Sequence, residues 1–221
     1  IVYYAIQSDN SGDAFLGEVL RAANRGVNVR ILVDGTINAS TSIQRSLRAL
    51  DTHTNIACKQ YNPVHLLKPW QWHALLHNKI MLVDDTHLLT GGRNIGDRFF
   101  DVEGYTGPVT YDRDVFVTAS AGDGSVMQEM RTFVDRLWTH EATQGVKAAK
   151  QPEAELERLL ASASRMEGEN RIYYEESLEM YATEALPTNK ITLIANPIHT
   201  GKKEPLVGNA IMRLAENAED S

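Results

Sequence analysis

Residues 77–94, HNKIMLVDDTHLLTGGRN, contain the side chains whose types and spacing could do chemistry. His77 and Lys79 stand two residues apart, and such side chains project from the same face of a strand, so an imidazole and an ammonium can converge on one anion. Gly91 and Gly92 allow backbone to come close to a ligand, and Asn94 can donate from its amide to a phosphate oxygen. The pattern H-x-K-x4-D-x6-G-G-x-N therefore predicts an active site for an anionic substrate.

A β-hairpin is the element that must position this pattern. The apolar stretch after Lys79 is predicted to be one strand, residues 87–90 the return strand, and residues 84–86 the turn. We expect Asp84 to tie down this turn by accepting hydrogen bonds. For Arg93 two roles stay open: it could bind the phosphate of a substrate, or it could form a salt bridge within the protein.

The residue types suit attack on a phosphodiester better than attack on a carbonyl. The imidazole of His77 would be the nucleophile, the cation of Lys79 would neutralise phosphate charge, and no step requires a metal ion. A nucleophilic histidine needs one ring nitrogen free, so a carboxylate has to hold the N–H of the other. Asp112 and Asp114 share a face of the later strand-like stretch YDRDVFVT, and either can be this orienting carboxylate.

Composition narrows the classes of function. The 221 residues carry a net charge of -7, which argues against broad, charge-driven binding of nucleic acid but allows a local basic pocket. The single cysteine, Cys58, excludes an internal disulfide and a multi-cysteine zinc site. No apolar run of about 18 residues is present, so no membrane-spanning helix is predicted. Because the chain starts at Ile1 without Met, we expect a piece of a longer protein whose upstream part could carry a membrane anchor.

Alternating strand and helix patterns predict an α/β fold around the hairpin. A strand at 1–6, a helix at 13–24 and a strand at 27–33 make a right-handed βαβ unit. Asp34 and Gly35 end its second strand at the sheet edge where α/β proteins place ligands. The other predicted elements of this part are a helix at 42–50, a strand at 55–60, a partly buried loop at 61–73, a strand at 111–118 and a helix at 124–139.

We divide the chain into three segments. Residues 1–145 are predicted to form one catalytic domain. Residues 146–189 are rich in glutamate, which indicates a solvated appendage or linker. Residues 190–221 look like the start of a second, truncated unit. The elements predicted in the last two segments are an exposed amphipathic helix at 151–166, a strand at 190–194 and a helix at 206–218.

The stretch HNKIMLVDDTHLLTGGRN resembles the HKD motif of the phospholipase D superfamily. GGRNIGDRFF, together with YNP upstream, is similar to the cardiolipin synthase branch of its bacterial members. The likeness extends over residues 1–142, where AANRGVNVRILVDG resembles the family's first helix and second strand, and YDRDVFV and FVDRLW resemble its later strand and closing helix. The resemblance implies an α/β fold with a mixed, largely parallel sheet flanked by helices on both faces, an αβα sandwich that forms one HKD half-domain.

The resemblance also implies roles for single residues. His77 would be the covalent nucleophile of a transient phosphohistidine that water or an alcohol resolves, and Asp112 would orient it. The residues expected around the phosphate are Lys79, Asn94, Gly91 and Gly92. The motif residues expected to have structural roles are Asp84, Asp114 and Arg93. We expect no cofactor and no metal.

The implied function is phosphatidyl transfer or hydrolysis at phospholipid headgroups, in a bacterial protein associated with the membrane. Family phosphatidyltransferases carry two HKD motifs and this chain has one, so a second half-domain would come in cis or through homodimerisation. Two alternatives stay open. One is a metal-independent nuclease-type phosphodiesterase that acts as a dimer, and the other is a catalytically incomplete half-domain with a binding or assembly role.

Overall fold

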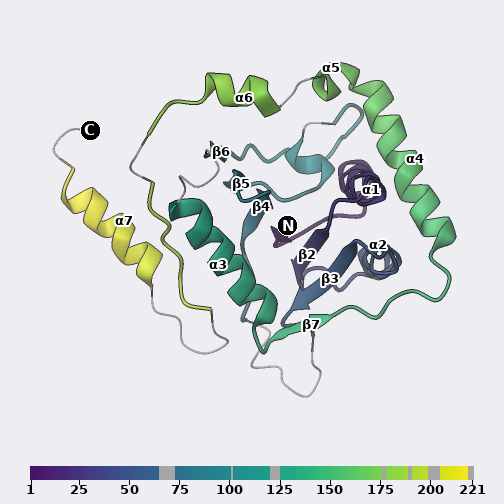
Figure 1. Cartoon of the computed structure of the whole chain (residues 1–221), viewed down its shortest axis with the longest axis horizontal. Coiled ribbons are helices and arrows are strands. Elements are labelled where there is room, and N and C mark those ends of the chain that lie inside the picture. The colour runs from purple at the N-terminus through teal and green to yellow at the C-terminus, as the bar shows by residue number, and fades with distance from the viewer. Residues whose placement is uncertain are drawn as a thin grey trace.

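The computed structural model describes residues 1–64, 73–100, 102–119, 125–175, 178–188, 191–198 and 205–218. A seven-stranded sheet with the order β6-β5-β4-β1-β2-β3-β7 forms its centre (Figure 1). The strands are β1 (Val2–Tyr3), β2 (Val29–Asp34), β3 (Ile56–Tyr61), β4 (Lys79–Val83), β5 (His87–Gly91), β6 (Asp114–Thr118) and β7 (Thr143–Gly145). Most of the loop predicted at residues 61–73 lies outside the described residues.

The five predicted helices are present in the predicted order, and the short helices α5 (Arg171–Tyr174) and α6 (Leu178–Glu184) were not predicted. The other helices are α1 (Asn10–Asn24), α2 (Thr41–Leu50), α3 (Ser125–Thr139), α4 (Glu153–Glu169) and α7 (Leu206–Glu216), and a 3-10 turn lies at Asp97–Phe99. Local chemistry explains where α1 begins and ends. The carboxylate of Asp9 accepts a hydrogen bond from the backbone N–H of Gly12 at 3.0 Å, and Gly26 leaves the helix with φ +96°.

The predicted α/β class and mixed sheet are confirmed, but the sheet is less parallel than predicted. Strands β1, β2 and β3 pair in parallel, as the βαβ pattern indicated. The remaining pairings, β4 with β1, β5 with β4, β6 with β5 and β7 with β3, are antiparallel. The tight turn between β4 and β5 requires antiparallel strands, and the helical crossovers join β1, β2 and β3 in parallel. The other antiparallel pairs bring together strands that long stretches of chain separate.

Helices cover both faces of the sheet, as predicted. Ile31 and Leu32 are neighbours in β2, so they point to opposite faces. Ile31 belongs to an apolar cluster with α1, α2 and α4, and Leu32 to a second cluster with Leu137 of α3 and Ile80 of β4. Figure 1 shows the sheet between α3 on one side and α1 and α2 on the other. Both faces of the central strands are therefore buried.

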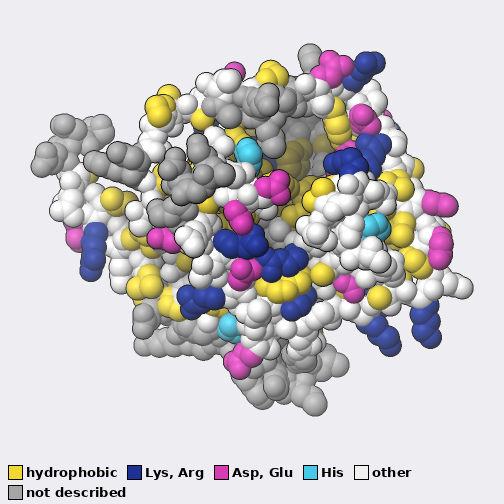
Figure 2. Space-filling view, in the orientation of Figure 1, with side chains coloured by type: hydrophobic (Ala, Val, Ile, Leu, Met, Phe, Trp, Pro, Cys, Tyr) yellow, Lys and Arg dark blue, Asp and Glu magenta, His cyan; other side chains and the backbone are white. Residues whose placement is uncertain are grey.

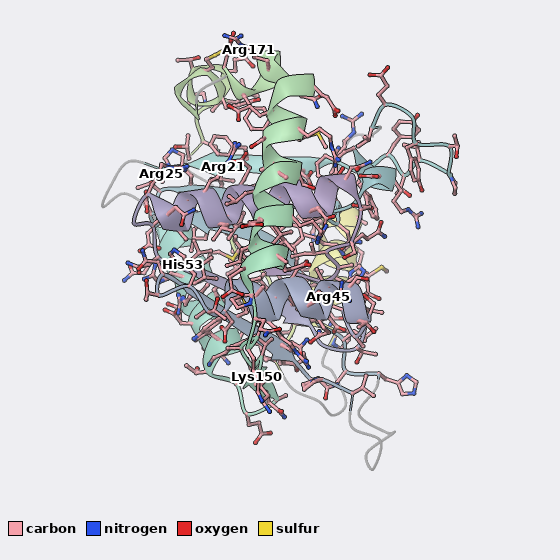
Figure 3. The ribbon with its side chains drawn as sticks, turned by 90° about the vertical axis from the view of Figure 1, so that its right-hand side faces the viewer. Arg21, Arg25, Arg45, His53, Lys150 and Arg171 are labelled. Carbon is pink, nitrogen blue, oxygen red and sulfur yellow. The ribbon has the colours of Figure 1, made fainter. Side chains whose placement is uncertain are left out.

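Helix α4 forms where the glutamate-rich pattern predicted a helix, but the prediction that it is exposed was wrong. Leu159 and Ala163 are fully buried, and α4 lies across α1 and α2 (Figure 3). The helices approach closely at Gly17, where a Cβ atom would come within 2.8 Å of the Ala163 Cβ atom. A stripe of small and leucine side chains is enough to bury this helix, although most of its surface is charged.

Polar contacts fix α4 to the two helices beneath it. The guanidinium of Arg158 pairs with Glu155 at 2.6 Å and also with Asp13 of α1. The buried carboxylate of Glu155 accepts a hydrogen bond from the Ser46 hydroxyl of α2 at 2.6 Å. Arg21 of α1, labelled in Figure 3, pairs with Glu167 of α4 at 2.8 Å. The first part of the predicted appendage is thus joined to residues 1–145.

The C-terminal segment differs from the prediction in one element. Residues 191–198 form no strand, although a strand was predicted at 190–194, while the helix predicted at 206–218 is present as α7. Leu193 and Ile198 pack against the apolar cluster on the α3 side rather than along a sheet edge. Their backbone therefore lacks the neighbouring strand that a ladder of hydrogen bonds requires. The division of the chain into three segments stays a prediction.

Candidate active site

The predicted hairpin is present, and it separates the motif into two ends. Strands β4 and β5 pair antiparallel from Ile80–Thr90 to Val83–His87. Asp84 and Asp85 form the turn with φ +51° and +55°, the conformation of a type I′ turn. His77 lies two residues before β4, at the opposite end of the hairpin. Asp84 consequently lies at the turn, in the position that its predicted structural role requires.

His77 and Lys79 converge at the end of the hairpin that is remote from the turn. The Lys79 Nζ atom lies 3.2 Å from Nε2 and 3.3 Å from Nδ1 of the His77 ring, and it donates to the His77 carbonyl oxygen at 3.2 Å. Lys79 is buried, with 5% of its surface exposed, whereas His77 is exposed. The ring of Tyr4 lies 4.4 Å from the His77 ring. An accessible imidazole is thus held against a buried ammonium and an aromatic ring.

Two charges act on the His77 ring in opposite directions. Partial desolvation, followed by the positive charge of Lys79, lowers the pKa of His77, while the negative charge of Asp34 opposes this shift. Desolvation also lowers the pKa of Lys79, against the effect of Asp112. The lowered pKa of His77 favours a neutral imidazole, which is the form that can act as a nucleophile.

Glycines 91 and 92 make room for the strand beside them. A Cβ atom on Gly92 would lie 2.7 Å from Oδ1 of Asp112, and one on Gly91 would lie 2.5 Å from the Arg113 carbonyl oxygen. The close approach predicted for these glycines is therefore made by the protein's own β6 and the residues before it. Asp112 and Asp114 reach the motif through the space that the missing side chains leave.

Arg93 forms a salt bridge, one of the two roles left open by its sequence. Its Nε atom lies 3.2 Å from Oδ2 of Asp114, its backbone N–H donates to Oδ1 at 3.3 Å, and its guanidinium donates to the Asp112 carbonyl oxygen at 2.8 Å. The charges of this pair also act on the Tyr3 hydroxyl. Burial, and then the charge of Asp114, raises the pKa of the Tyr3 hydroxyl to about 12. Arg93 and Asp114 thus hold β6 against the hairpin.

Asp112 and Asn94 lie at the same edge of the sheet as His77. The charge of Asp112 acts on Lys79, but no carboxylate among the described residues forms a hydrogen bond with the His77 ring. Its predicted role as the orienting residue stays a prediction. The Oδ1 atom of Asn94 is buried and has no hydrogen-bond partner within the described part of the chain. An amide oxygen is an acceptor, so the predicted contact with a phosphate oxygen would come from the N–H groups of the Asn94 amide and not from this atom.

Sequence reasoning missed Asp34, Tyr4 and Asn38 as parts of the site. Asp34 was placed at the ligand-binding edge of the sheet without a role, and that position was the available signal. Tyr4 follows β1 with no motif around it. Asn38 is buried, and its side chain joins the ends of β1 and β2. Except for the bond between Asn38 and Asp34, these contacts join residues that are distant in sequence, so no local pattern indicates them.

A cleft of about 660 Å³ opens beside His77. Its walls come from the sheet edge, from Met130 and Phe133 of α3, and from residues 192–198. The volume falls within the range of about 300–1,000 Å³ that is common for small-molecule sites. No three His, Cys, Asp or Glu side chains of the described residues are grouped to hold a metal ion. Nor is any helix in the described ranges both long and apolar enough to cross a membrane.

The chain is similar in sequence to known proteins. The family described as "Cardiolipin synthase, PLD-like domain" matches residues 1–138. Cardiolipin synthase C of Escherichia coli is 34% identical over 147 residues, which cover 62% of this chain and 29% of that protein. A cardiolipin synthase of Halalkalibacterium halodurans is 27% identical over 142 residues, 63% of this chain and 26% of that protein. The chain thus matches less than a third of either relative.

A solved structure is also similar. It is a phospholipase D family member, Nuc from Salmonella typhimurium, with 13% identity and a TM-score of 0.48, covering 66% of this chain and 80% of that one.

Proposed function

Since the chain belongs to the cardiolipin synthase, phospholipase D-like family, we propose that it cleaves phosphodiester bonds of phospholipid headgroups and transfers the phosphatidyl group to an alcohol or to water. The observation that carries this proposal is the accessible imidazole of His77 held against the buried ammonium of Lys79. A neutral nucleophile beside a fixed cation suits a phosphodiester, whose phosphorus atom is electrophilic and whose oxygens carry the negative charge.

The proposed reaction has two steps at the phosphorus atom. First, a ring nitrogen of His77 attacks phosphorus, the bond from phosphorus to the headgroup oxygen breaks, and the leaving oxygen takes a proton from a general acid. A phosphohistidine then carries the phosphatidyl group. In the second step an alcohol or water gives its proton to the same group, now acting as a general base, and attacks phosphorus, and the bond from phosphorus to His77 breaks. Lys79 and Asn94 would hold the phosphate oxygens in both steps.

The general acid has to come from outside the residues described around His77. We propose that a second HKD half-domain supplies it, either in the same polypeptide or from a second copy of this chain. Light scattering combined with activity measurements across protein concentration separates these cases. Activity per chain that rises with dimerisation supports a second copy. A monomer with full turnover of phosphatidylglycerol would contradict the proposal.

Membrane association is part of the proposal, because the substrate is a lipid. Two of the relatives are bacterial cardiolipin synthases. We propose peripheral contact with a bacterial membrane, or attachment through a segment outside this chain. Flotation of the chain with vesicles containing phosphatidylglycerol tests the first possibility.

A nuclease-type phosphodiesterase is the rival activity. Charges of both signs are interspersed on the face shown in Figure 2, and the chain has a net charge of -7. This distribution gives little support to tracking along a nucleic acid backbone. Cleavage of single-stranded DNA in the presence of a chelator, with no turnover of lipid, would favour the rival.

The decisive experiment compares wild type, His77→Ala and His87→Ala. His87 lies at the turn end of the same hairpin and serves as a matched control. Each protein receives phosphatidylglycerol vesicles, with products identified by mass spectrometry, and also bis(p-nitrophenyl) phosphate, whose leaving group is stable as an anion and needs no general acid. We expect wild type and His87→Ala to release nitrophenolate and His77→Ala to lose at least about 100-fold in rate. Equal rates for His77→Ala and wild type would end the proposal.

A further inference from the structure

Asp34 is a fully buried carboxylate at the end of β2, and backbone N–H groups occupy both of its oxygens. Its Oδ1 atom accepts hydrogen bonds from the N–H groups of Thr36 and Ile37, each at 2.9 Å. Its Oδ2 atom accepts one from the N–H of Leu76 at 2.7 Å. The first two bonds close the local turn, whereas the third reaches a segment that lies 42 residues further along the chain.

The third bond holds the backbone that leads directly into the active site. Leu76 is buried and is followed by His77. Two residues earlier, the carbonyl oxygen of Ala74 accepts a hydrogen bond from the side chain of Asn62 at 3.1 Å. Asp34 ends β2 and Asn62 follows β3, so the carboxyl ends of two parallel strands fix the segment that presents the imidazole.

The same network reaches the aromatic ring that packs on His77. The side-chain amide of Asn38 donates to the carbonyl oxygens of Asp34 at 2.8 Å and Tyr4 at 2.7 Å. Its Oδ1 atom accepts from the N–H of Ile6 at 3.0 Å. Tyr4 is thereby fixed relative to Asp34, and its ring limits where the His77 ring can lie.

The charge of Asp34 also acts on the imidazole. Asp34 raises the pKa of His77 in opposition to Lys79. Burial raises the pKa of the Asp34 carboxyl, while its three N–H donors favour the ionised form. Tyr61 also faces this carboxylate, since Asp34, after burial, raises the pKa of the Tyr61 hydroxyl. Lys79, Tyr61 and His77 are thus the titratable groups to be considered together with Asp34.

We propose that Asp34 is a positioning residue of this active site, which holds the His77 backbone through Leu76 and whose negative charge faces the ring while the ring gains positive charge. That positive charge develops when the nitrogen–phosphorus bond forms, because the other ring nitrogen keeps its proton. This inference rests on the proposed function, in which His77 is the nucleophile. Asp34 does not touch the substrate in this role.

The test compares Asp34→Asn with Asp51→Asn. Asp51 is a half-buried carboxylate that accepts one backbone hydrogen bond, from Cys58 at 2.7 Å, so its amide variant is a matched control. We expect Asp34→Asn to lower kcat on bis(p-nitrophenyl) phosphate by up to about 100-fold with little change in KM, because the nucleophile is misplaced after the substrate is bound. NMR of labelled histidine, assigned with His77→Ala, should show that the pKa of His77 falls in Asp34→Asn and stays unchanged in Asp51→Asn.

The outcomes separate this inference from the proposed function. A folded Asp34→Asn protein with wild-type kcat and wild-type titration of His77 overturns the role of Asp34. A shifted titration, with no cleavage of any phosphodiester by wild type, instead overturns the proposed function and leaves the link between the two residues standing. If Asp34→Asn does not fold, the NMR chemical shift of the Asp34 carboxyl carbon is measured against pH in wild type. This chemical shift should change as His77 titrates, and an unchanged shift would refute the link.

Discussion

The Lys79 ammonium is nearly equidistant from the two ring nitrogens of His77, at 3.2 Å from Nε2 and 3.3 Å from Nδ1. A cation in this place disfavours a second positive charge on the ring. The pair therefore keeps the imidazole neutral, and several consequences of this arrangement can be measured.

The pH dependence of the reaction should report the Lys79 charge. Only neutral His77 is nucleophilic, so the rate should rise with pH through a pKa below the ordinary histidine value of about 6.5. Removing the cation in Lys79→Met should raise the pKa of His77 and move this rise to higher pH. The measurement is a pH–rate profile with bis(p-nitrophenyl) phosphate. Lys59→Met, which removes a cation over the Trp138 ring, is the control and should leave the profile in place.

The two motif glycines should respond differently to alanine. In Gly91→Ala the new Cβ atom meets backbone, 2.5 Å from the Arg113 carbonyl oxygen, so we expect a loss of about 1–3 kcal/mol in the free energy of unfolding. In Gly92→Ala it meets only the Asp112 side chain, which can turn away, so stability should change less while turnover falls. Urea unfolding and kcat measure the two effects. Greater destabilisation by Gly92→Ala would contradict this account.

A substitution of Asp84 in the hairpin turn should leave both turnover and stability nearly unchanged. Asp84→Asn places a residue favoured in type I′ turns at φ +51°, at the end of the hairpin away from His77. We expect unchanged kcat and a change in unfolding free energy of no more than about 0.5 kcal/mol. Loss of turnover in a stably folded Asp84→Asn protein would assign a chemical role to this carboxylate.

Helix α4 should contribute strongly to stability. Leu159→Ala removes a fully buried side chain between α4 and α1, and we expect it to reduce the free energy of unfolding by about 2–5 kcal/mol. Leu186, which is 89% exposed, provides the control. Urea titrations of Leu159→Ala and Leu186→Ala that give the same midpoint would show that α4 is not part of the folded core.

Local patterns made much of the site predictable. The spacing of His77 and Lys79, the turn at Asp84 and the strand beyond it are encoded within residues 77–94, and the structure contains that hairpin. The antiparallel share of the sheet was missed, because strand direction depends on which distant strands become neighbours. The hydrogen bond between Asp34 and Leu76 joins residues 42 positions apart, so no window of sequence reveals it.

The burial of α4 escaped prediction for a different reason. Its buried positions, such as Leu159 and Ala163, are few and stand among glutamates that face solvent. Because the apolar stripe is narrow and charged residues surround it, the average hydrophobicity of α4 is as low as that of a helix exposed to solvent. The partner of this apolar stripe, the surface of α1 around Gly17, is identified only by the three-dimensional structure.

The packing of α4 against α1 has a practical consequence for truncated proteins. A polypeptide cut after residue 145 would keep the whole motif from His77 to Asn94, but it would uncover the apolar surface of α1 and α2 on which Leu159 and Ala163 rest. Newly exposed patches of this kind promote self-association. Expression boundaries and protease-resistant fragments should accordingly extend through residue 169, well beyond residue 138, where the family match ends.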